Sequence, residues 1–202
     1  MKYTKFIIPI FFLGSLWGLI EATLGEGLYA ADIPYASIYI TCLAVFLLAF
    51  SRGFLNVMGT SAIIAVVAAA YRLITTAFVC HFTAIIFLGV CFDILATLIM
   101  KKEERISWRV YLTGFITPLI NNALFVFTMF YVLNYDAWLL GGAQKGYNHI
   151  FVSGTITALA ALFLVPLGFY LGLKLRPALQ NKSKYAYSAL TISALIFWAI
   201  GF

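Results

Sequence analysis

Charged and amide side chains inside long apolar segments are the first candidates for chemistry in this chain. A charge within a membrane is costly, so residues of this kind usually face the interior of a helix bundle and mark a binding or transport path. The candidates within or at the ends of apolar segments are Glu21, Glu26, Arg72, His81, Asp93, Asn121 and Asn122. Together they could hold the polar groups of a small solute or relay protons.

The depth of the polar and aromatic residues along the predicted helices follows a pattern. Those at mid-depth are Trp17, Glu21, Asn121 and Asn122, and those progressively further out are Glu26, Tyr29, Tyr35, Tyr39, Arg72, His81, Tyr131, Tyr135 and Trp138. A solute site combines apolar walls with a few placed polar groups. We therefore predict an outward-opening pocket. Its predicted polar contacts are Glu21, Glu26, Arg72, His81, Asn121 and Asn122, and its predicted ring contacts are Trp17, Tyr29 and Tyr131.

Each of these residues also has a structural interpretation. Glu21 could be a hydrogen-bonded lock, and Arg72 could extend its charged end to the outer interface. His81 could be a donor between helices, and the two asparagines at 121 and 122 could join helices by hydrogen bonds. Convergence of Glu21, Arg72, His81 and Asn121 on one outward cavity would favour the pocket.

The elements that must position these residues are membrane-spanning helices. Hydrophobic residues make up 64% of the 202 residues and charged residues 10%, whereas a soluble domain is about half apolar and a quarter charged. In lipid, only helices and closed barrels satisfy the backbone. The apolar runs are about 18–25 residues long and do not alternate, which indicates helices. We predict an all-α, polytopic transmembrane bundle that forms one domain over residues 1–202.

The positive charges predict the number and direction of the spans. The predicted spans are 6–30, 35–50, 54–74, 77–100, 110–133, 150–173 and 185–202. With seven spans, all of the 13 Lys and Arg residues except Arg72 and Lys145 fall on the side of the N-terminus. The positive-inside rule then places the N-terminus in the cytoplasm and the C-terminus outside. The net charge of +6 therefore indicates topology rather than nucleic-acid binding.

The longest predicted outer loop, residues 134–149, mixes aromatic, glycine and polar residues. It could be an interfacial connector or a lid over the outward-facing pocket. Catalytic motifs are absent: the sequence has no phosphate-binding glycine loop, no HExxH and no nucleophile elbow. Cys42, Cys80 and Cys91 have no paired metal or redox spacing. We therefore expect no enzyme activity, no cofactor and no metal.

Gly14, Gly18 and Ala22 form a stripe of small residues in the first predicted span. Such a stripe lets another helix approach closely. It could face a partner subunit while Glu21 faces inward, or it could be an internal packing seam.

The chain carries this stripe, is of small size, has basic inner loops and contains the stretches "LWGLIEATLG" and "SRGFLNVMG". In these features it resembles the substrate-binding (S) subunits of energy-coupling factor (ECF) transporters. The resemblance covers about the first six spans. It implies a subunit that captures a micronutrient-like solute from outside and docks through Gly14, Gly18 and Ala22 onto a transmembrane coupling subunit with cytoplasmic ATPases. That family usually has six helices and an alanine stripe, whereas this chain has seven predicted spans and mainly glycine. No substrate carries over.

The leading hypothesis is therefore a solute-capture subunit of an ATP-driven importer, located in the plasma membrane of a prokaryotic cell and itself without ATPase activity. One alternative is a self-contained carrier or channel that uses Glu21 and Asp93 as proton-linked carboxylates, although Asp93 could instead pair with Arg52. Another is an intramembrane enzyme or redox protein. Haem b would need two opposed histidines at one depth, which here would be His81 and His149.

Overall fold

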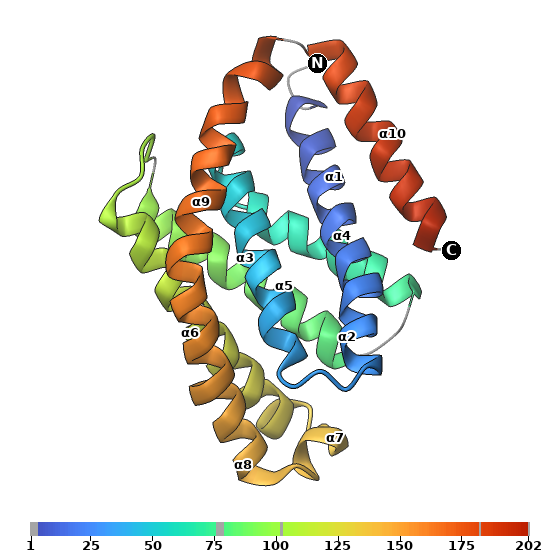
Figure 1. Ribbon diagram of the computed structural model, residues 1–202, viewed down its shortest axis with the longest axis vertical. Helices are drawn as coiled ribbons and strands as arrows, with labels where there is room; N and C mark the ends of the chain where they lie inside the picture. The colour runs from blue at the N-terminus through green and yellow to red at the C-terminus, as the bar shows by residue number, and fades with distance from the viewer. Residues whose placement is uncertain (1–3, 76–78, 102, 182, 202) are drawn as a thin grey trace.

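The computed structural model describes residues 4–75, 79–101, 103–181 and 183–201, and these residues form an all-helical bundle without strands (Figure 1). The elements, with η marking π-helical turns, are α1 Thr4–Ile20, η1 Glu21–Gly25, α2 Glu26–Ala30, α3 Ala36–Leu55, α4 Thr60–Thr75, α5 Val79–Leu95, η2 Ala96–Met100, α6 Trp108–Phe127, η3 Thr128–Val132, α7 Asp136–Leu139, α8 Gly142–Tyr147, η4 Asn148–Ser153, α9 Gly154–Asn181 and α10 Ser183–Gly201. The all-helical prediction is confirmed.

Five of the described helical segments are long and apolar enough to cross a membrane, judged by length and composition. They are Phe6–Ala30, Ala36–Leu55, Val79–Met100, Trp108–Val132 and Gly142–Pro177. Two further apolar helices, Thr60–Thr75 and Tyr185–Gly201, are shorter and occupy the third and seventh predicted segments. The prediction of a bundle of apolar helices suited to a membrane is thus confirmed in the length and composition of the helices.

Two predicted boundaries are corrected by the structure. Helix α3 continues to Leu55, so residues 54–55 end the second helix instead of starting the third. Asn56 then stops the helix in a left-handed conformation (φ 44°), which asparagine tolerates better than most residues. The sixth predicted span, 150–173, corresponds to a helical segment that begins at Gly142. The junction of the third and fourth predicted spans includes residues 76–78, which lie outside the described residues.

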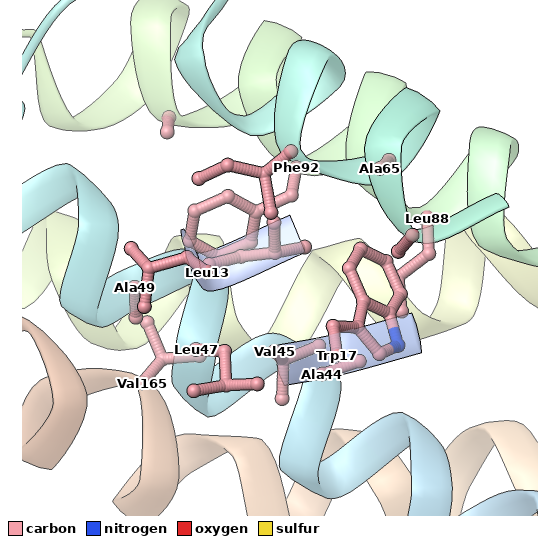
Figure 2. Packing of buried hydrophobic residues seen from close by; sticks show 14 of the residues in the cluster. Leu13, Trp17, Ala44, Val45, Leu47, Ala49, Ala65, Leu88, Phe92 and Val165 are labelled. Carbon is pink, nitrogen blue, oxygen red and sulfur yellow. The ribbon is translucent and has the colours of Figure 1, made fainter. Parts of the chain in front are cut away.

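The core is built from large side chains of several helices that meet around small residues of their neighbours. Leu13 and Trp17 of α1 pack with Leu88 and Phe92 of α5, and Val165 of α9 closes the opposite side (Figure 2). Trp17 is only 1% exposed. This buried position removes Trp17 from any wall that a solute could reach.

The small-residue stripe of α1 is an internal seam with α4. A Cβ built on Gly14 would lie 2.5 Å from Val67 Cβ, and one built on Gly18 would lie 2.5 Å from Tyr71 Cβ. The partner-subunit interpretation of this stripe is therefore corrected, because α4 already covers both glycines. Ala22, the third residue of the predicted stripe, lies in η1 and is partly exposed.

Gly18→Ala should destabilise the bundle by about 1–3 kcal/mol, because the added methyl group forces α1 and α4 apart. Gly27→Ala in α2 is the matched control, since a Cβ there meets nothing within 4 Å. Thermal unfolding in one detergent compares the two variants. Equal midpoints for both variants would contradict the tight seam.

Helix α10 packs along α1 and α4. The Phe11 and Trp198 rings stack with centroids 6.1 Å apart, and Trp198 Nε1 donates a hydrogen bond to Ser15 Oγ at 2.9 Å. The Tyr71 hydroxyl donates to the Phe197 carbonyl at 2.7 Å. The seventh predicted segment is therefore an integral part of the bundle.

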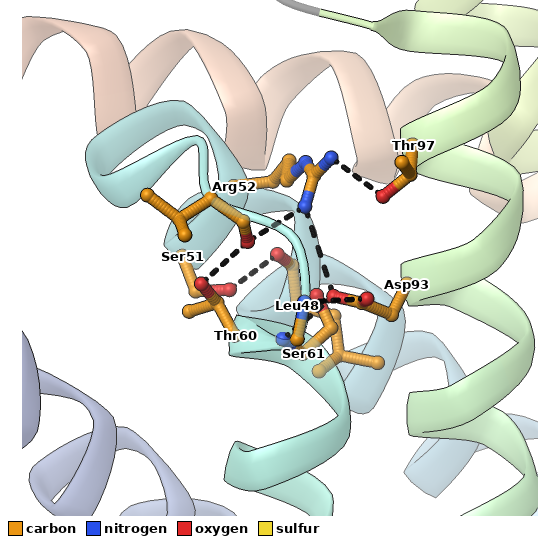
Figure 3. A network of polar contacts seen from close by, with 9 residues as sticks. Leu48, Ser51, Arg52, Thr60, Ser61, Asp93 and Thr97 are labelled. Atoms are coloured by element: carbon orange, nitrogen blue, oxygen red, sulfur yellow. Dashed lines mark hydrogen bonds and ion pairs between the residues drawn. The ribbon is translucent and has the colours of Figure 1, made fainter.

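A buried polar network joins α3, α4 and α5 (Figure 3). Arg52 Nη1 lies 3.7 Å from Asp93 Oδ1, and Arg52 Nη2 donates to Thr97 Oγ1 at 2.9 Å. Asp93 accepts backbone N–H bonds from Gly59 at 2.7 Å and Ser61 at 3.1 Å, at the N-terminus of α4, where a negative charge is stabilised. The predicted pairing of Asp93 with Arg52 is confirmed.

Candidate functional site

A pocket of about 1020 Å³ is lined by residues of α2, α3, α4, α5, α6, α7, α8 and η4. Helices α2, α7 and α8 lie at one end of the bundle, opposite the start of α1 and the end of α9 (Figure 1). Because its walls come from segments far apart in the sequence, this cavity depends on the whole fold. Its volume is at the upper end of the usual range for small-molecule sites, about 300–1,000 Å³.

One wall is an ion-pair cluster centred on Arg72 of α4, whose side chain is 2% exposed. Arg72 Nη1 lies 2.6 Å from Glu26 Oε1, and Nη2 lies 3.2 Å from His81 Nδ1. A guanidinium only donates, so His81 Nδ1 must accept. We infer that His81 is neutral with its hydrogen on Nε2. The Tyr29 ring stacks on the imidazole, with centroids 5.2 Å apart.

A second wall presents two amides of α6. Asn121 and Asn122 are each 6% exposed, and both line the pocket. Asn122 Nδ2 donates to the Pro118 carbonyl at 2.8 Å. Asn121 Oδ1 is buried and has no hydrogen-bond partner among the described residues. A buried acceptor in this state costs about 1–3 kcal/mol. If the amide turned toward the cavity, a bound molecule with a donor group could satisfy it.

The third wall is aromatic and comes largely from the segment 134–149. Trp138 packs edge-on against Phe125 and His149, with each pair of ring centroids 5.1 Å apart. Lys145 Nζ lies 4.9 Å from the centre of the Trp138 ring and donates to the Ala137 carbonyl at 2.8 Å. This segment was predicted to be either a connector or a lid. It folds into α7 and α8 and supplies part of the pocket wall.

The structure brings six predicted site residues to this pocket. They are Glu26, Tyr29, Arg72, His81, Asn121 and Asn122. It also adds residues that the predicted site did not include, among them Phe125, Trp138, Lys145 and His149. The available signal for three of these was the aromatic and polar composition of residues 134–149.

Three predicted contacts are corrected, because they do not line the pocket. Trp17 lies in the core and donates its Nε1 hydrogen to Glu21 Oε1 at 3.1 Å, one turn along the same helix. Glu21 is therefore held by its own helix. Tyr131 is 74% exposed and packs beside Phe127 on the outer surface. It follows Asn121 by ten residues and lies in the π-helical turn η3, where the α-helical register of Asn121 no longer holds.

No protein-family model, no curated protein and no solved structure matches this chain. Among the residues that the structure describes, no group of three His, Cys, Asp or Glu side chains is placed to hold a metal ion. The pocket combines a buried cation in contact with Glu26 and His81, an amide oxygen without a hydrogen-bond partner among the described residues, and an aromatic wall.

Proposed function

We propose that the chain captures a small solute from the outer side of a membrane. The observation that carries this proposal is the large pocket that Asn121 lines, whose buried Oδ1 has no hydrogen-bond partner among the residues that the structure describes. Arg72, Glu26 and His81 fix the polar end of this pocket. Pre-positioned polar groups of this kind, set in mostly apolar walls, are typical of small-molecule sites.

The proposed topology has seven spans, with the N-terminus in the cytoplasm and the pocket facing outward. It rests on the distribution of basic residues, of which Arg72 and Lys145 form the outer set. Both of these residues line the pocket, which is consistent with an outward opening. The proposed location is the plasma membrane of a prokaryotic cell.

The capture is proposed to serve a multi-subunit importer. The sequence has no phosphate-binding loop, so a transmembrane coupling subunit with cytoplasmic ATPases would supply the energy. The resemblance to ECF S subunits supports this assignment. A coupling subunit would contact a face other than Gly14 and Gly18, because α4 covers them.

A proton-linked carrier built on Glu21 and Asp93 has less support. Asp93 is held by Arg52 and by two backbone N–H groups at the start of α4. Glu21 accepts a hydrogen bond from Trp17. Neither carboxylate lines the pocket, so neither is placed to couple a proton to a solute there.

Native mass spectrometry of the protein, purified in mild detergent, should show one bound small molecule. Ala84→Trp should reduce this added mass, because Ala84 lines the pocket and the indole would occupy part of the cavity next to the solute. Val90→Trp is the matched control on the same helix, since Val90 is 36% exposed and lies outside the pocket lining. Equal retention in both variants would place the bound molecule elsewhere.

Liposomes distinguish capture from transport. The purified chain alone should bind the released solute but should not accumulate it inside vesicles. Uptake by the chain alone would contradict the role of a capture subunit and would favour the self-contained carrier.

A further inference from the structure

The formal charges at the pocket wall do not balance. The charged side chains among the described lining residues are Glu26, Arg72 and Lys145. Glu26 pairs with Arg72 at 2.6 Å. No carboxylate of the described residues lies within ion-pair distance of Lys145. If both histidines are counted as neutral, the formal charges of the described lining residues sum to +1.

The surroundings of Lys145 hold its ammonium group without neutralising it. Its Nζ donates to the Ala137 carbonyl and lies over the Trp138 ring. A carbonyl oxygen and an aromatic face both attract a cation, and they leave its formal charge intact. Lys145 is exposed, so solvent screens part of its charge. A concave site with apolar walls concentrates the remaining field and raises the local concentration of ions of opposite sign.

The unpartnered acceptor on α6 sets a second requirement. Asn121 is 6% exposed, and its buried Oδ1 has no partner among the described residues. An amide oxygen can only accept, so the group that satisfies it must carry an N–H or O–H. Because Oδ1 has less than 1 Å² of accessible surface, a solute contacts it once the amide turns toward the cavity. Asn121 and Lys145 belong to different walls of the pocket, so they would contact different parts of one solute.

On the basis of the capture function proposed above, we infer that the solute is a small organic anion with one net negative charge. Its carboxylate lies against Lys145, and a ring N–H or a hydroxyl elsewhere on the molecule donates to Asn121 Oδ1. A monocarboxylate fits the single excess charge better than a phosphate monoester, which carries about 1.5–2 negative charges at neutral pH.

Three indole probes of similar shape and different charge test the anionic group. Indole-3-acetate, indole-3-acetamide and tryptamine are titrated against the purified full chain by calorimetry. The carboxylate should bind at least tenfold more tightly than the amide, and the ammonium compound should bind most weakly. Lys145→Gln should remove the preference for the carboxylate. Lys174→Gln should keep it, because Lys174 makes the same kind of contact, 4.7 Å from the Tyr170 ring, outside the pocket lining.

The donor group is tested with 1-methylindole-3-acetate, which lacks the ring N–H. Methylation should weaken binding at least tenfold in the unmodified protein and much less in Asn121→Leu. Equal affinity for the carboxylate and the amide would overturn the inferred charge, and so would a carboxylate preference that survives Lys145→Gln. An unchanged effect of methylation in Asn121→Leu would overturn the donor assignment.

The molecule released in native mass spectrometry separates failure of this inference from failure of the proposed function. A released cation or neutral compound overturns the anionic class and leaves solute capture intact. A released monoanion supports the class, even when the indoles do not fit. If no molecule is released and no probe binds, solute capture itself fails.

Discussion

Arg72→Met should destabilise the protein by about 2–3 kcal/mol and abolish retention of its solute. Arg72 is 2% exposed and joins α4 to Glu26 of α2 and His81 of α5. Removing one member of a buried pair costs about 3–5 kcal/mol because the other charge is left without a partner. The expected value is smaller here, since the Glu26 side chain is 45% exposed. Thermal unfolding measures the stability, and native mass spectrometry measures the retention.

Arg109→Met is the matched control for this prediction. Arg109 also pairs with a glutamate, at 3.3 Å from Glu103 Oε1, but its side chain is 38% exposed. An ion pair of this kind contributes about 0–1 kcal/mol. Arg72→Lys provides a folded protein for the binding assay if Arg72→Met does not fold. It should still reduce retention of the solute, because one ammonium group does not reproduce the forked donor geometry of the guanidinium. Full retention in both Arg72 variants would contradict the role of this cluster.

Asp93→Leu should destabilise the bundle by about 3–5 kcal/mol, because it leaves Arg52 buried without its carboxylate. Arg52 is 3% exposed and Asp93 is 4% exposed. Asp93→Asn keeps an acceptor for the start of α4 and should cost less, about 1–3 kcal/mol. Thermal unfolding ranks the two variants, with Glu104→Gln as an exposed acidic control.

The asparagine variant also separates a structural role from proton coupling. Asp93→Asn should retain the solute, because Asp93 lies outside the pocket lining. Loss of solute from a well-folded Asp93→Asn protein would contradict the structural assignment and would revive the proton-linked carrier.

The sequence predicts well how far along its helix each residue of the site lies. Glu26, Tyr29, Arg72, His81 and the two asparagines interrupt apolar segments. Polar groups there must avoid lipid, so they turn toward a shared interior. The partner of Asp93 could be predicted for the same reason, because a buried charge needs an opposite charge.

Direction around a helix axis is much harder to predict. Trp17 and Tyr131 have suitable depth, but one faces the core and the other faces outward. Tyr131 lies within the π-helical turn η3, and such a turn shifts the register of a helix. Trp17 precedes η1, so its direction follows from the packing of α1 in the core. No local sequence pattern predicts either of these two features.

The remaining features of the site depend on contacts between segments that are distant in the sequence. The small-residue stripe of α1 permits either a partner subunit or a neighbouring helix, and only tertiary packing selects α4. The contribution of Trp138 and Lys145 to the pocket wall likewise depends on how α7 and α8 pack against Phe125 of α6. These two residues carry no signature in the sequence that links them to Arg72.

The position of Trp138 gives the pocket an intrinsic optical reporter. Of the four tryptophans, Trp138 alone lines the described pocket wall, whereas Trp17 belongs to the core and Trp108 is 67% exposed. Indole fluorescence responds to the polarity of its surroundings. In a protein whose Trp17, Trp108 and Trp198 are replaced by phenylalanine, the emission of Trp138 would follow occupancy of the pocket in real time and without a label.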